Sequence, residues 1–269
     1  KTIPVERAGC YVPAGRFPLL SSVIMTVTPA VAAGVGEVIM CTPPRVHPDD
    51  VSESSKSGAG VPGKAFVGGK PYADEGVMAA AYICGVNHLY AVGGAQAIGA
   101  MAYGTESIPK VDVIVGPGNK YVATAKKLVY GKVGIDMIAG PTEVMIIADG
   151  SANAEWVAAD LLAQAEHDVV AQPILVTTST ALAEKVSAEI ENQLETLTTK
   201  ATARQSIDNF GVIIIADSLE QAAEIANKKA PEHLELALEQ GEERTKLESL
   251  VHNYGSLFIG HYAAEVYGD

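Results

Sequence analysis

The stretch Val-Met-Ile-Ile-Ala at residues 144–148 decides the fold class, and Val-Ile-Ile-Ile-Ala at residues 212–216 repeats its character. A strand with one wet face alternates apolar and polar side chains, whereas both of these runs are apolar at every position. Strands covered on both faces are typical of the centre of a parallel sheet. Ala-rich helical patterns follow the two runs, near 152–167 and 218–229. The sequence therefore predicts an α/β fold with parallel strands.

The same alternation continues outward from these runs over almost the whole chain. Further strands are predicted at 10–12, 38–41, 89–92, 111–115, 173–177 and 256–259, and further helices near 21–34, 73–84, 94–103, 119–130, 180–197 and 240–252. In the helix over 180–197, Leu182, Val186, Ile190 and Leu194 form an apolar stripe that predicts a core-facing side. The pattern restarts at Ala-Gly-Pro-Thr (139–142), which predicts two domains, 1–142 and 143–269. Residues 45–70 are rich in Ser, Gly and Pro without periodicity, and predict a mobile surface loop.

Composition excludes several classes of protein. The chain has 269 residues, of which 48% are hydrophobic, so that a sizeable core is available. Its 19 basic and 32 acidic residues give a net charge of -13, which argues against a nucleic-acid or anionic-membrane partner. The odd number of cysteines, Cys10, Cys41 and Cys84, includes no CxxC pair and predicts a reducing cytoplasm. We find no signal-peptide pattern and no apolar stretch long enough to span a membrane.

Two nucleotide-binding patterns in the loop region are rejected. Residues 58–63 read Gly-Ala-Gly-Val-Pro-Gly, which matches G-x-G-x-x-G letter by letter. The dinucleotide fingerprint requires a strand before it and a helix after it, whereas a Ser-rich run precedes this one and Pro62 stands where the helix should begin. Residues 58–65 also resemble a Walker A sequence but end in Ala65, which lacks the hydroxyl that binds magnesium. A flexible loop is the simpler interpretation.

Gln164 and His167 form a first candidate site. Asp160, Gln164 and His167 are spaced i, i+4 and i+7 and share one face of the helix predicted over 152–167. Polar groups one turn apart can hold one metal ion, and histidine is a common zinc ligand. A histidine that interacts favourably with the C-terminal end of the helix dipole is the alternative, and spacing alone favours it.

Glu232 and His233 form a second candidate site. Pro231 ends a helix, an apolar strand-like run follows, and the pair is predicted at the end of a strand, where open α/β sheets place their chemistry. A histidine beside a carboxylate is suited to proton removal. An exposed loop histidine explains the residues equally well.

Glycine-rich turns suggest a ligand of a different kind. Gly-Gly-Ala-Gln (93–96) and Gly-Pro-Gly-Asn (116–119) each follow a strand and begin a helix, and Gly-Pro-Thr-Glu (140–143) follows an apolar run. Helix N-termini preceded by small residues offer free N–H donors to phosphate or carboxylate groups. Ordinary tight turns are the alternative, but the repetition favours ligand binding.

Taken together, these segments resemble the histidinol dehydrogenase family of zinc- and NAD-dependent enzymes. The stretches that carry the resemblance occur in family order at 9–15, 92–98, 115–119, 135–143, 160–167, 230–234 and 253–260. The resemblance implies two incomplete Rossmann-like domains with mostly parallel sheets and no G-x-G-x-x-G fingerprint. It assigns NAD binding to the first domain, and the zinc ligands and the catalytic pair to the second.

The resemblance also assigns roles to single residues. Glu232 and His233 match the catalytic pair, and Gln164, His167 and Asp269 match zinc ligands that also contact the substrate. Tyr11, Gln96 and Asn119 match positions that contact NAD. Thr142 stands where the family usually has a substrate-binding serine, and Ala14 replaces a glycine common in the family's turn, which restrains that turn if it requires a positive φ.

The implied activity is the NAD-dependent oxidation of L-histidinol through the aldehyde to L-histidine, the last step of histidine biosynthesis. The family is a homodimer in which a C-terminal tail completes the partner's site, and this chain ends at Asp269, before the position of that tail. It also lacks the family's N-terminal helical segment, and its 45–70 loop is longer than the family connection. Two alternatives therefore stay open: a family member that oxidises another polar alcohol, such as a sulfonated diol, and a truncated chain that binds metal or nucleotide without catalysis.

Overall fold

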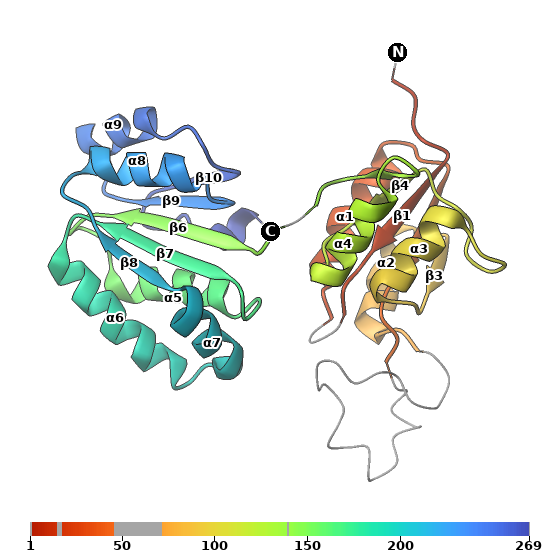
Figure 1. Ribbon diagram of the computed structural model, residues 1–269, viewed down its shortest axis with the longest axis horizontal. Coiled ribbons are helices and arrows are strands. Elements are labelled where there is room, and N and C mark those ends of the chain that lie inside the picture. The colour runs from red at the N-terminus through yellow and green to blue at the C-terminus, as the bar shows by residue number, and fades with distance from the viewer. Residues whose placement is uncertain (1, 15–17, 46–71, 139, 269) are drawn as a thin grey trace, which may run out of the picture. The chain divides into compact units, whose positions relative to one another are not determined.

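The chain folds into two units that divide between Gly140 and Pro141 in this computed structural model (Figure 1). The structure describes residues 2–14, 18–45, 72–138 and 140–268. The loop predicted over 45–70 lies outside the described residues except for Arg45. Each unit is an α/β domain with a five-stranded parallel sheet, which confirms the predicted fold class.

Unit 1 alternates strands and helices from its first strand to its last. Its elements are β1 (Arg7–Tyr11), α1 (Leu20–Ala32), β2 (Glu37–Cys41), α2 (Glu75–Cys84), β3 (His88–Tyr90), α3 (Gly94–Tyr103), β4 (Val113–Val115), α4 (Lys120–Val129) and β5 (Gly134–Ile135). The strands lie in the order β3-β2-β1-β4-β5. One face of the sheet packs against α3 and α4 and the other against α1 and α2, so that β1 at the centre is buried on both sides.

Unit 2 repeats the same winding. Its elements are β6 (Glu143–Ala148), α5 (Ala154–Ala165), β7 (Gln172–Thr177), α6 (Thr180–Leu194), α7 (Lys200–Phe210), β8 (Val212–Ile215), α8 (Leu219–Lys229), β9 (His233–Ala237), α9 (Glu242–Leu250), β10 (Ser256–Ile259) and the 3-10 turn η3 (Glu265–Gly268). The strand order is β10-β9-β6-β7-β8. Counted from the first strand of each unit, both sheets follow the order 3-2-1-4-5 of a doubly wound nucleotide-binding fold.

The central strand of unit 2 is β6, which contains the apolar run at residues 144–148. In β6, Val144 and Ile146 face a cluster covered by α5 and α6, whereas Met145 and Ile147 face a cluster covered by α8 and α9. The apolar stripe predicted from Leu182 to Leu194 is buried in the first of these clusters, as expected. Among the described residues, no helix has the length and apolar character needed to cross a bilayer.

The second apolar run occupies a different place from the predicted one. β8 pairs with β7 alone and is the edge strand of the sheet, not a central one. Val212 and Ile215 are 45% and 53% exposed. An all-apolar run is typical of a strand in a sheet, but it does not show whether that strand has one neighbouring strand or two.

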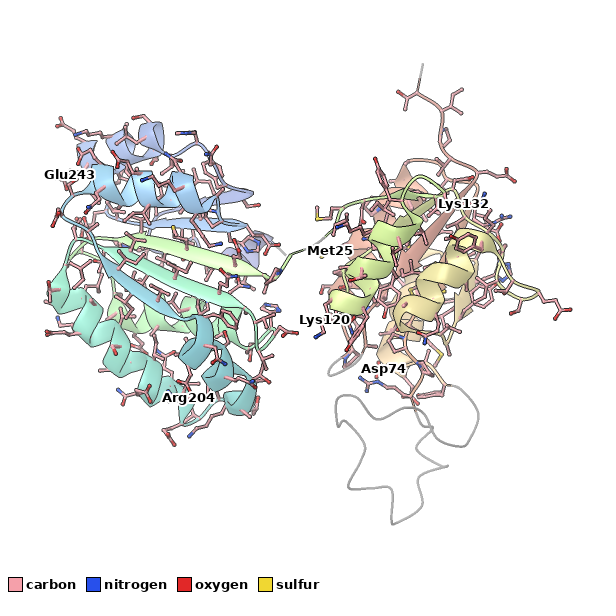
Figure 2. The ribbon with its side chains drawn as sticks, in the orientation of Figure 1. Met25, Asp74, Lys120, Lys132, Arg204 and Glu243 are labelled. Atoms are coloured by element: carbon pink, nitrogen blue, oxygen red, sulfur yellow. The ribbon has the colours of Figure 1, made fainter. Side chains whose placement is uncertain are left out.

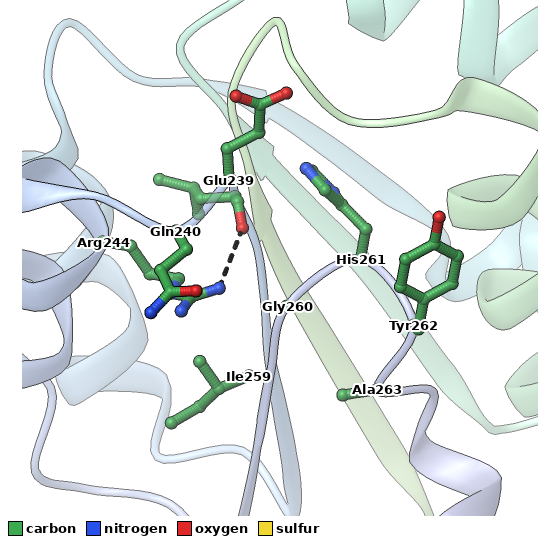
Figure 3. A pocket seen from close by; sticks show the side chains of 9 residues that line it. Glu239, Gln240, Arg244, Ile259, Gly260, His261, Tyr262 and Ala263 are labelled. Atoms are coloured by element: carbon green, nitrogen blue, oxygen red, sulfur yellow. Dashed lines mark hydrogen bonds between the residues drawn. The ribbon is translucent and has the colours of Figure 1, made fainter.

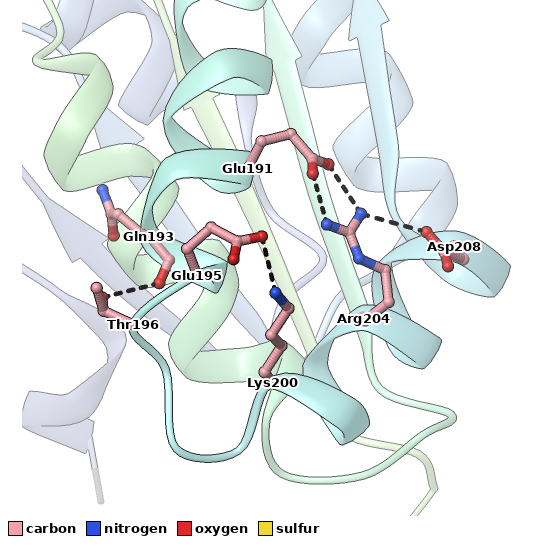
Figure 4. Close-up of polar contacts among 7 residues, drawn as sticks. All are labelled: Glu191, Gln193, Glu195, Thr196, Lys200, Arg204 and Asp208. Carbon is pink, nitrogen blue, oxygen red and sulfur yellow. Dashed lines mark hydrogen bonds and ion pairs between the residues drawn. The ribbon is translucent and has the colours of Figure 1, made fainter.

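Apart from the 3-10 turn η3, two elements were absent from the predicted set, strand β5 and helix α7. The two-residue strand β5 is too short to leave a pattern. Strand β9, expected only as a strand-like run after Pro231, begins at His233. Helix α7 is polar along most of its length. Arg204 links it to α6 by a two-pronged pair with Glu191, and makes a longer contact with Asp208 within α7 itself (Figure 4). Because ion pairs rather than an apolar stripe mark this helix, hydrophobic periodicity did not reveal it.

A buried lysine stabilises the turn that follows β4. Lys120 and Lys132 reach solvent (Figure 2), but Lys126 is 3% exposed and pairs with Asp136. The Lys126 Nζ also donates to the carbonyl of Gly116 at 3.0 Å, and the Gly116 N–H donates to Asp136 at 2.7 Å. Gly116 has a φ of +121°, and a Cβ there would lie 2.1 Å from the carbonyl oxygen of Tyr11. The turn therefore requires glycine and is anchored by both charged side chains.

We expect Lys126→Met to lower the free energy of unfolding by about 2–3 kcal/mol, because it leaves Asp136 without its cation and the Gly116 carbonyl without its donor. Urea denaturation measures the change. Lys127→Met is the control, since Lys127 is the exposed neighbour on the same helix and should shift stability by less than about 0.5 kcal/mol. Equal shifts in the two variants would show that the buried pair does not stabilise the turn.

Candidate active site

Glu232 and His233 lie at the amino end of β9, not at the carboxyl end of a strand as the sequence analysis expected. Ala230 ends α8 in a left-handed conformation with a φ of 52°, Pro231 is buried, and the strand begins at His233 without an intervening loop. In the sheet, His233 is paired with Val144 of β6. The amino ends of β6 and β9 therefore meet at one edge, which brings Thr142 beside Glu232.

A chain of hydrogen bonds joins three of the predicted site residues. The Thr142 hydroxyl donates to Glu232 Oε2 at 2.8 Å and accepts from Gln164 Nε2 at 2.6 Å. The backbone N–H of Glu143 donates to the same Glu232 oxygen at 3.2 Å. Because a carboxylate can only accept, Thr142 must donate to it, and its own acceptor position is then filled by the Gln164 amide. These hydrogen-bond directions place the Gln164 Nε2 atom toward Thr142 and leave Oε1 as the other end of the amide.

The remaining oxygen of Gln164 is buried and has no hydrogen-bond partner. Gln164 itself is 1% exposed, in the last turn of α5. A buried polar atom without a partner is costly, and a bound ligand is a common explanation for one. The orphaned oxygen therefore fits a position that accepts a metal or substrate, as predicted for Gln164.

The other predicted metal ligands are less closely defined. His167 is exposed and lies two residues beyond the end of α5, where its N–H donates to the Gln164 carbonyl at 3.3 Å. Asp269 lies outside the described residues. Among the residues that the structure describes, no group of three or more His, Cys, Asp or Glu side chains is arranged to hold a metal ion. The zinc-ligand roles of Gln164, His167 and Asp269 remain predictions.

His233 is mostly enclosed by its neighbours. Its side chain is 12% exposed, and its ring lies 5.9 Å from that of Phe258 on β10. The Nδ1 atom is buried without a hydrogen-bond partner and faces Glu265 Oε2 at 3.8 Å. The start of β10 also approaches closely, because a Cβ on Gly255 would lie 2.5 Å from the Glu232 carbonyl. The predicted catalytic pair is therefore packed from β10 and η3.

Further carboxyl groups lie near His233. The sequence analysis did not assign them to this site. Glu235 lies two residues along β9 and is 4% exposed, and the backbone N–H of Glu265 donates to it at 2.8 Å. Burial raises the pKa of Glu235 to about 8, and the charges of Asp160 and Glu265 add to this effect. Burial also raises the pKa of Asp160 to about 6, again with a contribution from Glu265. The strand alternation in His-Leu-Glu-Leu-Ala was the available signal, because it places Glu235 on the same face as His233.

We expect the raised pKa of Glu235 to make the fold less stable as pH rises. The unfolded chain releases this proton near the ordinary value of 4.5, whereas the folded chain keeps it until about pH 8. The stability of the wild-type protein should therefore fall across this interval, and Glu235→Gln should reduce the fall. Melting temperatures recorded between about pH 5 and pH 8 measure it, at roughly 2–4 °C per kcal/mol. Glu239→Gln removes an exposed glutamate near the end of the same strand and should keep the wild-type slope; an unchanged slope in Glu235→Gln would contradict the assignment.

The residues predicted to contact NAD lie at the carboxyl edge of the unit 1 sheet. Tyr11 ends β1, Gln96 is exposed in the first turn of α3, and Asn119 precedes α4. In a sheet of this strand order, nucleotides bind at the carboxyl ends of the two central strands, which here are β1 and β4. The three positions therefore share the appropriate edge, and their contact with NAD remains a prediction.

Several backbone N–H groups at the helix N-termini of this edge already have hydrogen-bond partners, whereas the sequence analysis expected them to be free for a ligand. The Asn119 side chain accepts from the N–H groups of Tyr121 and Val122, at 3.0 and 3.2 Å, and so caps α4 itself. The Gly94 N–H at the start of α3 donates to the Tyr11 hydroxyl at 3.0 Å. Burial raises the pKa of that hydroxyl and this N–H opposes the shift. A ligand at this edge would have to use other donors or displace these contacts.

A cavity of about 510 Å³ lies elsewhere in unit 2, at the carboxyl ends of β9 and β10 (Figure 3). Arg244 lies in its wall and its Nη1 donates to the Leu238 carbonyl at 3.5 Å. His261 and Tyr262 line the other side. None of the predicted site residues contributes to this cavity, which lies at the edge of the sheet opposite Glu232.

Comparisons with known proteins agree with the resemblance seen in the sequence. The family model described as Histidinol dehydrogenase matches residues 1–269. The histidinol dehydrogenase of Streptococcus mutans is 52% identical over 99% of this chain and 56% of its own length, and that of Thermus thermophilus is 49% identical over 99% and 57%. This chain thus spans little more than half the length of these relatives.

Solved structures give the same result. A histidinol dehydrogenase from Elizabethkingia anophelis has a TM-score of 0.84 and 39% identity, over 98% of this chain and 55% of that one. A propionaldehyde dehydrogenase from Rhodopseudomonas palustris, at 13% identity and a TM-score of 0.55 over 97% of this chain and 65% of that one, shares the fold alone. With a family model that covers every residue and relatives near 50% identity, the chain belongs to the histidinol dehydrogenase family.

Proposed function

We propose that this chain carries the catalytic core of an NAD-dependent oxidation of L-histidinol to L-histidine. The observation that carries the proposal is the hydrogen-bonded series Gln164, Thr142 and Glu232 beside His233, which leaves the Gln164 oxygen buried without a partner. Family membership supplies the reaction, and this arrangement supplies groups suited to it. Zinc and NAD are part of the proposal.

In the first half of the reaction, His233 removes a proton. It accepts the proton of the substrate hydroxyl while a hydride leaves the carbon that bears this hydroxyl for NAD⁺, which gives the aldehyde and one NADH. The partial enclosure of the ring limits competing protons from water. Phe258 packs near the imidazole and restricts its position.

In the second half, Glu232 acts as the base. Water adds to the aldehyde carbon as the Glu232 carboxylate accepts one of its protons, and the resulting hydrate gives a second hydride to a second NAD⁺. The product is the carboxylic acid. The hydrogen bonds from Thr142 and from the Glu143 N–H hold the carboxylate in one orientation for this step.

The proposed metal position uses the side-chain oxygen of Gln164, with His167 and Asp269 as the further ligands of this chain. A bound zinc ion would hold the substrate by its imidazole and its amine, and would fix the position of its alcohol carbon. Gln164 is neutral, so it leaves more positive charge on a metal than an anionic ligand in its place would. At the other proposed site, Tyr11, Gln96 and Asn119 orient NAD at the carboxyl edge of the unit 1 sheet.

The test is the formation of NADH from NAD⁺ and L-histidinol by zinc-loaded protein expressed from the complete open reading frame. Two NADH per L-histidinol are expected, because the alcohol loses four electrons on its way to the acid. A sulfonated diol serves as the comparison substrate and should give no NADH. Folded, zinc-bound protein that forms no NADH from L-histidinol would contradict the proposal.

The comparisons do not favour either alternative from the sequence analysis. The relatives near 50% identity are named histidinol dehydrogenases. NADH formed from the diol alone would nevertheless identify a different alcohol as the substrate, and zinc bound without turnover would identify a binding protein. A homodimer is also proposed, and light scattering on the complete protein tests it.

A further inference from the structure

The catalytic histidine of the proposed reaction has two ring nitrogens in different surroundings. Nδ1 is buried and has no hydrogen-bond partner, while the side chain as a whole keeps 12% exposure. A nitrogen that is closed off in this way cannot meet a substrate, so that proton exchange must use Nε2. For Nε2 to accept a proton, the neutral ring must carry its hydrogen on Nδ1.

The group that faces Nδ1 is a carboxylate. Glu265 Oε2 lies 3.8 Å from this nitrogen, and the Glu265 side chain is only 4% exposed. The backbone N–H of Glu265 donates to Glu235 Oε1 at 2.8 Å, and this contact fixes the turn η3 against β9. A main-chain group of Glu265 therefore helps to hold the turn, and its side-chain carboxylate lies against the histidine.

We propose that Glu265 is a positioning residue for His233, whose carboxylate keeps the proton on Nδ1 and leaves Nε2 free to accept the hydroxyl proton of the substrate. The inference rests on the proposed role of His233 as the base. A carboxylate behind an imidazole fixes its tautomer and stabilises the imidazolium that forms when the other nitrogen takes a proton. A separation of 3.8 Å is long for a hydrogen bond, and such contacts commonly shorten when substrate binds.

The charged and titratable groups around His233 support this assignment. Glu232 adjoins it in sequence, Glu235 follows on β9, Asp160 lies on α5 and Glu265 on η3, whereas β10 contributes the apolar ring of Phe258. Burial raises the pKa of Glu235 to about 8, so this group is protonated at neutral pH and adds no charge to the cluster. Glu265 is the carboxylate placed against Nδ1.

A purely structural role for Glu265 predicts a different result. Its charge raises the pKa values of both Asp160 and Glu235, so a negative charge on Glu265 opposes the ionisation of these two groups. Glu265→Gln keeps the shape and removes this charge, and should leave the melting temperature unchanged or higher. A positioning role predicts that the same variant loses activity while its stability is maintained.

The kinetic experiment compares Glu265→Gln with Glu235→Gln in zinc-loaded protein from the complete open reading frame. Glu265→Gln should lower kcat about 10- to 100-fold with little change in KM. Glu235→Gln removes a carboxyl group from the same cluster but not one that faces Nδ1, and should keep the wild-type kcat. Equal kcat in Glu265→Gln and the wild type would overturn the proposal.

A second measurement does not depend on turnover. The chain has six histidines, and in protein labelled with ¹⁵N-histidine the His233 signals are those missing from His233→Ala. Long-range ¹H–¹⁵N correlations should show the proton on Nδ1 in the wild type and a larger share of it on Nε2 in Glu265→Gln. Glu265→Asp keeps the charge and should recover most of the Nδ1-protonated form, and it replaces Glu265→Gln if the latter fails to fold. A wild-type proton on Nε2 would overturn the inference, whereas the expected tautomer in protein that forms no NADH would contradict only the proposed reaction.

Discussion

His233→Ala is expected to reduce turnover of L-histidinol about 1,000-fold while the protein keeps its zinc. Loss of a positioned general base typically costs 10²- to 10⁴-fold, and the ring is not among the proposed metal ligands. Steady-state NADH formation gives the rate, and metal analysis of the same preparation gives the zinc content.

The control for this variant is His252→Ala, which removes an exposed histidine of the same unit. It should match the wild type in both rate and zinc content. A His233→Ala protein that loses zinc as completely as activity would contradict the role of His233 as a base, because it would place the imidazole among the metal ligands. A rate within about twofold of wild type would exclude it from the chemistry altogether.

His167→Ala is expected to abolish stable zinc binding, and activity with it. Removal of an outer hydrogen-bonding partner lowers metal affinity by roughly 10- to 100-fold, and loss of a direct ligand should cost more. Zinc content after extensive desalting measures the loss. The exposed position of His167 beyond the end of α5 means that the fold itself should tolerate the change, and the melting temperature without added metal should match that of metal-free wild type.

The presence of a histidine at position 167 also has an explanation that does not involve a metal. A histidine just beyond a helix C-terminus interacts favourably with the helix dipole, and spacing alone favoured that interpretation. If it is the whole explanation, His167→Ala will bind as much zinc as wild type and lose a few tenths of a kcal/mol of stability. His252→Ala again provides the matched control, and unchanged zinc content in His167→Ala would remove the residue from the ligand set.

The fold was predictable where local patterns report burial. The alternation of apolar runs with helical stripes gave two parallel α/β layers, because a strand or helix that is covered must be apolar on the covered side. The same patterns misplaced 212–216, since edge and central strands differ in their hydrogen-bonded neighbours and not in their own composition. Helix α7 was missed because its contact with α6 is made in part by Arg204 and Glu191.

The sequence named candidate site residues but could not predict the hydrogen bonds that join three of them. Gln164, Thr142 and Glu232 were named from the resemblance, and 90 residues of sequence separate the two that share the Thr142 to Glu232 hydrogen bond. That the pair Glu232–His233 opens a strand rather than ending one follows from the immediate start of β9 after Pro231. Glu265 carries no local signal at all, because its importance lies in its burial against a histidine 32 positions away.

Each of the two sheets is assembled from one uninterrupted stretch of chain, with β1 to β5 before Gly140 and β6 to β10 after it. During synthesis, the first sheet therefore has all of its strands before any strand of the second has been made. Domains of multidomain proteins generally fold as units, the N-terminal one first. The edge at which Tyr11 and Asn119 lie can thus be completed on the ribosome while the residues around Glu232 are still untranslated, so that the proposed nucleotide edge can become ordered before the proposed catalytic edge.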